Sequence, residues 1–457
     1  HVTDTVRKKI VDIDIFTDDP YALMLGMMCA NFSSGIWLLI ATYFKYPVST
    51  THSIIGAIVG FALAYAGSSA IVWKTIGFIV LSWIISPVIS GIFSYSIFFV
   101  VRKYVYHAID PFKMTLRIFP ILAFVTFLIN SFFIFYKGAP QLKLDEIPLW
   151  VSIVTSFSIA IFIALLSKIL YIPYVKRKIL ASFNETGRDT NSPENIERLS
   201  NMLVLQSLSH TEESYTDEIE TIDGNVNNEG NININEENIE ENEDGGPLYL
   251  ENEPLDANIK RIKEYHKTLK ERKKSNKINT LHESSEIFEP KVEKLCTWLQ
   301  VITACFSAFA HGANDVANSV APFATVYSIY ITGEVIKKSD VPIWILAMGG
   351  LGIVIGLGTW GYRIIERIGT ELTKVTASRG FIMELSAALT VVIASRTKMP
   401  VSTTHCQVGS VIGCGLADGK NNIEWRHVKN IILSWIITLP VTGLISAALF
   451  SFGYYSP

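Results

Sequence analysis

Long uncharged apolar stretches alternate with short charged segments along most of this 457-residue chain. A helix of about 20 apolar residues crosses the hydrocarbon core of a bilayer. Stretches of suitable length without Lys, Arg, Asp or Glu occupy residues 20–44, 75–101, 118–136, 147–167, 341–362 and 430–457. Two shorter and more polar candidates lie at 295–310 and 381–395. The pattern predicts an all-α polytopic membrane protein with about eight spanning helices.

A hydrophilic region of different composition separates the two apolar portions. Residues 174–290 carry 14 Lys/Arg against 25 Asp/Glu, a difference of −11 in a chain whose net charge is −3. Such an acidic segment, poor in apolar residues, buries too little surface to offset the entropy of ordering. We therefore predict a largely disordered insertion at 174–290, between a first membrane portion at 1–173 and a second at 291–457.

The charges that flank the spans predict which side of the membrane the insertion faces. The loop at 102–117 holds four Lys/Arg and one acidic residue, whereas the loop at 137–146 holds two residues of each sign. Positively charged loops stay in the cytoplasm. We therefore expect the 102–117 loop and the insertion to be cytoplasmic, and the chain to reside in the plasma membrane.

A sequence repeat relates the two membrane portions. Residues 46–60 align without a gap onto 399–413, and both segments contain Pro-Val-Ser-Thr-Thr-His. The segment Leu-Ser-Trp-Ile-Ile at 81–85 recurs at 433–437. Duplicated membrane units with Gly- or Pro-interrupted segments are typical of secondary transporters that bind their cargo between the repeats. The repeats are inverted if the number of spans between them is odd, which depends on whether 312–330 adds a crossing.

Each Pro-Val-Ser-Thr-Thr-His segment predicts the start of a helix within the membrane. Pro disfavours helix before it, Ser is a good N-cap, and the two Thr fall in the first turn. Hydroxyls and free N–H groups then converge at the positive end of the helix dipole, which suits an oxyanion. A lone triplet more often bonds only locally, but the duplication favours a paired oxyanion site. Its predicted ligands are Ser49, Thr50, Thr51, Ser402, Thr403 and Thr404.

The two His residues that end these segments have two candidate roles. His52 and His405 can each donate a hydrogen bond to the anion, or can bond a nearby carbonyl group for structural reasons. The sequence leaves both roles open.

A second polar cluster spans His311 to Ser319 and reads His-Gly-Ala-Asn-Asp-Val-Ala-Asn-Ser. It follows an uncharged helical stretch and precedes Pro322, where we expect the helix to break. A carboxylate inside the membrane is costly, and so Asp315 marks a functional site. The alternative is that Asp315 only caps a broken helix. Hard oxygen ligands for a small cation are offered by Asn314, Asp315, Asn318 and Ser319.

Glu384 is a second acidic residue within an apolar stretch. Its carboxylate either takes part in ion coupling or pairs with a neighbouring basic residue, Arg379 or Arg396. The sequence does not decide between these roles.

The paired Pro-Val-Ser-Thr-Thr-His segments, the Gly-Ala-Asn-Asp-Val-Ala-Asn segment and the long insertion together resemble the inorganic phosphate transporter (PiT) family of sodium-coupled symporters. The resemblance covers about residues 20–173 and 295–455. It implies two inverted repeats with re-entrant or broken helices, and phosphate held between the two helix ends. It also implies sodium bound by Asn314, Asp315, Asn318 and neighbouring oxygens, with Asp315 close to the phosphate as well.

One feature of the family pattern is absent. Members of the family have two Gly-Ala-Asn-Asp-Val-Ala-Asn segments, one in each repeat, whereas this chain has only the copy in the second portion. Gly312 lies 88 residues before Pro400, whereas only 46 residues precede Pro47. The other copy would therefore fall ahead of His1, and we expect N-terminal helices of the first repeat to be missing from this chain.

These observations predict secondary active transport of inorganic phosphate coupled to sodium, without a cofactor. Sulfate or another oxyanion is the alternative cargo, because helix ends and hydroxyls bind tetrahedral oxyanions generally, and protons are the alternative coupling ion. An enzyme is not expected, since no Gly-x-Ser-x-Gly elbow occurs. A receptor or scaffold would place the function in the insertion. Expected partners are phosphate, sodium, the lipid bilayer and, as one option, a second copy of the chain, but no nucleic acid.

Overall fold

The computed structural model describes residues 10–136, 147–189, 285–336, 341–396 and 401–456. Within these ranges the regular structure is helical, apart from one isolated bridge between Val11 and Ile71. The chain divides into two compact units, one formed by 1–172 with 278–457 and the other by 173–277. The described part of the second unit lies in α7 (Ile172–Asp189). Most of the predicted insertion, 190–284, lies outside the described residues.

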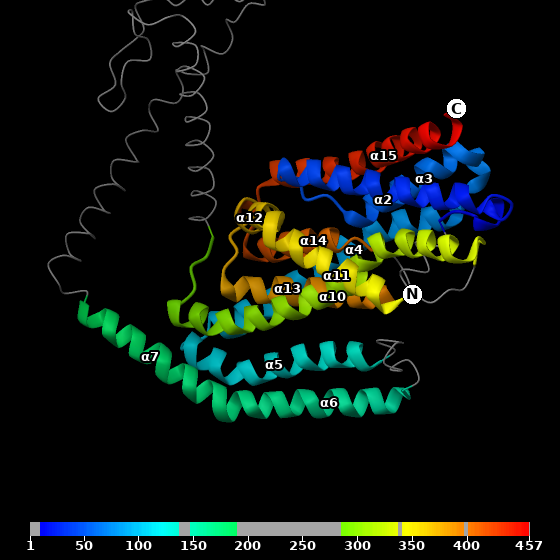
Figure 1. Cartoon of the computed structure of the whole chain (residues 1–457). Helices are drawn as coiled ribbons and strands as arrows, with labels where there is room; N and C mark the ends of the chain where they lie inside the picture. Colours follow the sequence, from blue (N-terminus) through cyan, green and yellow to red (C-terminus); the bar gives the residue numbers. More distant parts are fainter. Residues whose placement is uncertain (1–9, 137–146, 190–284, 337–340, 397–400, 457) are drawn as a thin grey trace, which may run out of the picture. The chain divides into compact units, whose positions relative to one another are not determined.

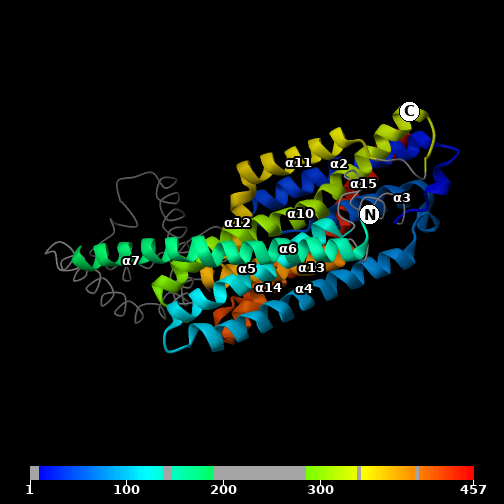
Figure 2. The same cartoon turned by 90° about the horizontal axis from the view of Figure 1, so that it is seen from below.

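The first unit contains eleven further α-helices in its described ranges (Figure 1). Its first portion holds α2 (Pro20–Tyr43), α3 (Thr50–Ala66), α4 (Trp73–Val101), α5 (Pro111–Phe135) and α6 (Leu149–Leu166). Its second portion holds α10 (Pro290–Thr332), α11 (Ile343–Gly356), α12 (Tyr362–Thr370), α13 (Ala377–Arg396), α14 (Thr403–Asp418) and α15 (Trp425–Tyr455). In Figures 1 and 2, α5 and α6 lie side by side as a hairpin.

The predicted polytopic helical architecture is confirmed. Nine helical segments of the described chain are long and apolar enough to cross a membrane, and each of the eight predicted stretches overlaps one of them. The ninth, Thr50–Ala70, begins at the first Ser-Thr-Thr triplet. Large apolar side chains are exposed on the outer faces of these helices, as on Leu351, Val354 and Ile355 of α11. Such faces suit contact with lipid.

The predicted helix break at Pro322 was wrong. The helix α10 runs without interruption through 43 residues and includes Pro322. At a rise of about 1.5 Å per residue it is roughly 65 Å long, so that Asp315 lies near its middle and does not cap a helix end. Proline is tolerated inside membrane helices, because neighbouring helices and local adjustments satisfy the backbone groups that it frees.

The short helix α3 packs along the second half of α15. Near the start of α3, Nδ1 of His52 lies 3.4 Å from the backbone oxygen of Trp435, in the middle of α15. Near the end of α3, the Tyr455 hydroxyl donates to the backbone oxygen of Ala64 at 3.3 Å. The two helices therefore run in the same direction, although they belong to different portions of the chain.

The short helix α14 has the same relation to α4. Nδ1 of His405 lies 3.0 Å from the backbone oxygen of Trp83, and Arg102 donates to the backbone oxygen of Ala417 at 2.6 Å. In the chain, α4 starts directly after the end of α3, and in space it runs alongside α14 in the same direction. The two short helices therefore point away from each other. Their first turns therefore face each other inside the first unit.

Glycine pairs allow this close packing. A Cβ added to Gly60 would lie 2.1 Å from the backbone oxygen of Gly443 on α15, and one added to Gly413 would lie 2.1 Å from that of Gly91 on α4. Small residues let membrane helices approach until their backbones touch. The matching contacts fix both short helices against their long partners.

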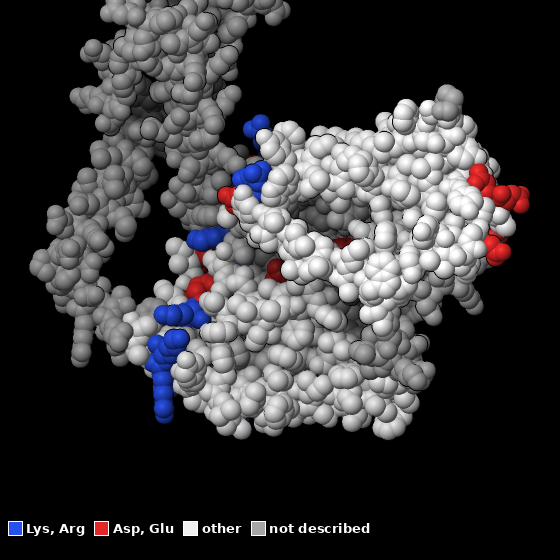
Figure 3. Space-filling view, in the orientation of Figure 1, with Lys and Arg blue, Asp and Glu red and all other residues white. Residues whose placement is uncertain are grey.

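Charged side chains of the first unit are distributed between its two ends. Basic residues, with acidic residues among them, gather where α4 and α14 end and where α5, α10 and α13 begin; the basic ones include Arg102, Lys103, Lys113, Arg117, Lys291, Lys294 and Arg379. Acidic residues mark the opposite end, where α2 begins and α10 ends; they include Asp12, Asp14, Asp18, Asp19 and Glu334. Between the ends, the face shown in Figure 3 is largely free of charge.

An ion-pair cluster stabilises the basic end. The buried Arg379 guanidinium lies 2.8 Å from Asp418, and Arg102 lies 2.6 Å from Glu286, which also contacts His107. Burial alone would raise the pKa of Glu286, but hydrogen bonds and charge from His107 and Arg102 bring that pKa below its ordinary value. The carboxylate therefore stays ionised and fixes the segment that leads into α10.

We predict that Gly413→Val destabilises the protein, because its side chain would meet the α4 backbone. Overpacking of this kind costs about 1–3 kcal/mol or more, which should lower the Tm in detergent by roughly 3 °C or more. The control is Gly352→Val on α11, where an added Cβ has nothing within 4 Å. Equal Tm values for the two variants would contradict the close contact between α14 and α4.

Candidate functional site

Both Ser-Thr-Thr triplets begin helices, as predicted. Ser49 and Ser402 have extended backbones, and their hydroxyl oxygens accept hydrogen bonds from the backbone N–H groups of His52 at 3.3 Å and His405 at 3.2 Å. Each Ser therefore caps the third residue of its helix. The N–H groups of the first two residues have no partner within their own helix and point toward the helix start.

Reciprocal hydrogen bonds hold the two helix starts together. The Thr51 hydroxyl donates to the backbone oxygen of Val401 at 3.3 Å, and the Thr404 hydroxyl donates to that of Val48 at 3.4 Å. Each triplet thus contacts the extended segment that precedes the other triplet. All six predicted oxyanion ligands belong to these two facing starts.

The middle of α10 contacts both helix starts. Asp315 Oδ2 accepts a hydrogen bond from the Thr403 hydroxyl at 2.8 Å. The amide nitrogen of Asn318 lies 3.0 Å from the Thr50 hydroxyl and 3.2 Å from the Thr51 hydroxyl. The continuous helix therefore brings the predicted cation ligands beside the predicted anion ligands.

Two buried amide oxygens in this cluster lack a hydrogen-bond donor. Asn314 and Asn318 are 0% and 3% exposed, and the Oδ1 atom of each has no partner among the described residues. An unsatisfied buried acceptor is costly. Together with the Asp315 carboxylate, these oxygens supply the hard ligands that a small cation prefers.

Ser319 differs from the other predicted cation ligands. Its side chain is exposed, and its backbone oxygen accepts a hydrogen bond from Asn31 of α2 at 3.2 Å. It therefore lies outside the group formed by the buried Asn314 and Asn318 and the partly buried Asp315.

The two predicted His residues lie between the facing helix starts. The ring centroids of His52 and His405 are 4.5 Å apart, and each ring packs against a Trp ring, Trp83 at 3.7 Å or Trp435 at 3.6 Å. Each Nδ1 atom faces the backbone oxygen of a Trp, which matches the structural role considered above for one ring nitrogen. The other nitrogen, Nε2, is buried in both residues and has no partner in the described ranges.

Glu384 belongs to a neighbouring polar group. Its carboxylate accepts a hydrogen bond from Gln407 at 3.3 Å and another from Ser307, whose hydroxyl also lies 3.4 Å from His311. The proposed pairing with Arg379 was wrong, because Arg379 pairs with Asp418. The Arg396 side chain lies outside the described residues.

Three residues around this site were not among the predicted ligands: Trp83, Trp435 and Gln407. Trp83 and Trp435 occupy equivalent positions in the repeated Leu-Ser-Trp-Ile-Ile segments. The repeat indicated the alignment of the two halves, but no role was predicted for these two residues. A duplicated polar aromatic residue inside a predicted span was the available signal. Gln407 follows the second His by two positions and has no counterpart in the first repeat, where Ile54 stands at the equivalent place.

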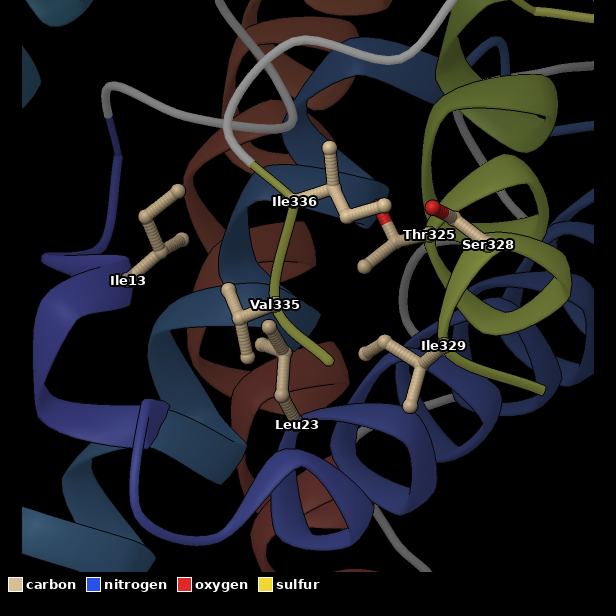
Figure 4. A pocket seen from close by; sticks show the side chains of 7 residues that line it. All are labelled: Ile13, Leu23, Thr325, Ser328, Ile329, Val335 and Ile336. Atoms are coloured by element: carbon tan, nitrogen blue, oxygen red, sulfur yellow. The ribbon is translucent and has the colours of Figure 1, made fainter. Parts of the chain in front are cut away.

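A separate small pocket lies near the acidic end. Figure 4 shows it between the turn at Ile13–Phe16, α2, α10 and the segment that follows α10. Among the described residues, its lining is mostly apolar and contains no charged side chain: Ile13, Leu23, Thr325, Ser328, Ile329, Val335 and Ile336. This chemistry does not suit a phosphate ion. A hollow on the face in Figure 3, by contrast, has acidic atoms visible inside it.

Comparison with known proteins identifies several relatives of this chain. A family model described as "Phosphate transporter family" matches residues 1–446. Sodium-dependent phosphate transporter 1 of Homo sapiens is 31% identical over 99% of this chain and 88% of its own length. The protein of the same name from Xenopus tropicalis is 32% identical over 100% of this chain and 87% of its own.

A solved structure is also similar. It is titled "The sodium-dependent phosphate transporter" and superimposes with a TM-score of 0.68 at 27% identity, covering 100% of this chain and 86% of that one. The likeness therefore extends to the arrangement of the helices.

We predict that sodium stabilises the purified protein through the buried oxygens on α10. At ten times its dissociation constant, a bound ion adds about 1.4 kcal/mol to the free energy of unfolding. The Tm should therefore be a few degrees higher in sodium chloride than in choline chloride. Asp315→Asn and Asn318→Leu should remove the difference, because they remove a charge or an oxygen ligand.

The matched control is Ser319→Ala, which changes an exposed hydroxyl next to Asn318. It should retain the sodium-dependent rise in Tm. Equal loss in Ser319→Ala would show that the cation binds elsewhere than at Asn314, Asp315 and Asn318.

Proposed function

This chain belongs to the phosphate transporter family, and on that basis we propose how its residues bind and couple the transported ions. The protein carries inorganic phosphate across a membrane in symport with sodium. The observation that carries the site assignment is the pair of facing helix starts bridged by the middle of α10.

Phosphate binds between the first turns of α3 and α14. Each start offers two free N–H groups, the hydroxyls of one Ser-Thr-Thr triplet and the positive end of a helix dipole. The two sets of donors come from opposite directions, which suits a tetrahedral anion. The proposed ligands are Ser49, Thr50, Thr51, Ser402, Thr403 and Thr404.

Sodium binds beside the phosphate, at Asn314, Asp315 and Asn318. Among the side chains that form this cluster, only Asp315 carries a charge, and a bare carboxylate would repel the anion. A sodium ion on Asp315 offsets this repulsion and satisfies the two amide oxygens that lack donors. Because Thr403 contacts Asp315 directly, each ion favours the binding of the other.

We further propose that the α2–α3–α4 and α13–α14–α15 segments are two inverted repeats. The opposed directions of α3 and α14 support this arrangement, and inverted units permit access to one site alternately from the two sides. The basic end of the first unit then faces the cytoplasm. The insertion at 174–290 is cytoplasmic on the same grounds, and the membrane is the plasma membrane.

The outer helix faces are proposed to contact lipid, and a second copy of the chain is one further candidate partner for them. An intramembrane hydrolase is the alternative function. It is disfavoured because Ser49 accepts a hydrogen bond from the backbone of His52, while the ring Nδ1 of that His faces a carbonyl group. The Ser hydroxyl and the imidazole thus do not form a nucleophile and base pair.

Each positive charge that moves inward with the cargo releases roughly 2.3 kcal/mol per 100 mV of membrane potential. Sodium binding in excess of the phosphate charge therefore allows the potential to drive uptake. Proton coupling would instead give uptake that does not depend on sodium.

We predict that Thr403→Ala and Asp315→Asn each lower sodium-dependent uptake of labelled phosphate at least about tenfold, while the protein still reaches the membrane. Each change removes a hydrogen bond to a charged group, which is typically worth about 1.5–3 kcal/mol. The control is Thr359→Ala, which changes an exposed Thr on the π-helical turn Leu357–Gly361. Full uptake in both site variants would refute the site assignment.

Deletion of residues 192–282 should spare phosphate uptake, because none of the proposed ligands lies in the insertion. A scaffold or receptor function would depend on that segment. The comparison of uptake per molecule at the membrane, with and without the segment, separates these functions. Loss of uptake in a deletion variant that retains the sodium-dependent rise in Tm would assign the insertion a direct part in transport.

A further inference from the structure

Four aromatic rings form a continuous stack between the two helix starts. Trp83 packs on His52, His52 contacts His405 edge to face, and His405 packs on Trp435. Both His residues are 3% exposed. We call His52 and His405 the His pair.

Hydrogen bonding determines which ring nitrogen of each His carries the proton. Nδ1 of His52 and of His405 faces a backbone oxygen, at 3.4 Å and 3.0 Å respectively. A carbonyl oxygen only accepts, so Nδ1 must be the donor. In the neutral imidazole the other nitrogen, Nε2, is then a lone-pair acceptor. Both Nε2 atoms are buried, and neither has a donor within the described part of the chain.

The position of the His pair places these acceptors beside the proposed phosphate site. Each His is the third residue of its helix, and helical side chains lean toward the helix N-terminus. Because the two rings touch across the gap between α3 and α14, both extend into the space between the helix starts. The free N–H groups of the same first turns point into that space.

Acceptors in such a site distinguish phosphate from sulfate. The two ions have nearly the same size and shape, and N–H or O–H donors bind both. At neutral pH, however, phosphate keeps at least one P–OH group, whereas sulfate has none. An acceptor takes a hydrogen bond from P–OH but repels an oxygen of sulfate. Asp315 is already engaged by hydrogen bonds from Thr403 and Asn314, whereas neither Nε2 atom has a hydrogen-bond partner among the residues that the structure describes.

We propose that His52 and His405 are specificity-determining residues, whose Nε2 atoms accept hydrogen bonds from the hydroxyl of hydrogen phosphate and thereby exclude sulfate. The inference rests on the proposed phosphate site between α3 and α14. It assigns the donors of the helix starts to general oxyanion binding and the His pair to the choice among oxyanions.

The first experiment uses the unmodified chain and four anions that compete with labelled phosphate during sodium-driven uptake. Phosphate and arsenate carry a hydroxyl, whereas sulfate and monofluorophosphate do not. A site that bonds a hydroxyl strongly rejects analogues without one, so the inhibition constants of sulfate and monofluorophosphate should exceed that of arsenate by about 100-fold or more. If the protein takes up phosphate and all four anions inhibit this uptake equally, the specificity role of the His pair is overturned and the proposed function stands. Absence of sodium-driven phosphate uptake would instead overturn the proposed function.

The second experiment separates a specificity role from a structural one. In His405→Asn the side-chain amide can still donate to the Trp83 carbonyl, but the Nε2 acceptor is gone. In His405→Gln an amide oxygen can take the place of Nε2, but the bond to the carbonyl is lost. The same pair of variants applies to His52, whose partner is the Trp435 carbonyl.

The specificity role predicts that the Asn variants lose at least about tenfold of the discrimination against sulfate and that the Gln variants retain most of it. A purely structural role predicts instead that the Asn variants have a higher Tm than the Gln variants, because only Asn keeps the bond to the carbonyl. Discrimination would then be unchanged in every variant that folds. Discrimination is a ratio of two constants measured on the same protein, and so it does not depend on the amount of folded transporter. Unchanged discrimination in both Asn variants would overturn the proposal.

Discussion

The structure depends on the unpaired N–H groups of two helices that begin inside an apolar bundle. A helix start leaves N–H donors without partners, and no water is available within a bilayer to satisfy them. Ser49 and Ser402 each cap one of these donors. The remaining donors of α3 and α14 face each other. They form the proposed phosphate site, which holds no Lys or Arg side chain among the described residues.

The other features of the first unit support this pair of helix starts. Glycine pairs bring α3 against α15 and α14 against α4, close enough for backbone contact. The middle of α10 supplies Asp315 and Asn318 to both starts. The long helix thereby places a negative charge beside the proposed anion site, and this arrangement favours anion binding only when a cation is present. In the proposed function, coupling between the two ions therefore follows from the short distance between their proposed ligands.

Several parts of this arrangement could be predicted from local sequence patterns. The uncharged stretches located the spanning helices, because crossing a bilayer demands both length and apolarity. The helix starts at Thr50 and Thr403 followed from local rules for Pro, Ser and Thr. The continuity of α10 through Pro322 could not be predicted in this way, because neighbouring helices, which a local rule does not include, decide whether a proline breaks a membrane helix.

The sequence by itself determined which segments enter the membrane, where two helices begin and which residues repeat, since these properties depend on local composition and order. Only the tertiary structure decided that the two helix starts face each other, that Arg379 pairs with Asp418 instead of Glu384, and that the His rings touch between two Trp rings. His52 and His405, for example, contact each other although they are more than 300 positions apart in the chain. Their partners are set by the close packing of helices from both halves of the chain, which no local pattern specifies.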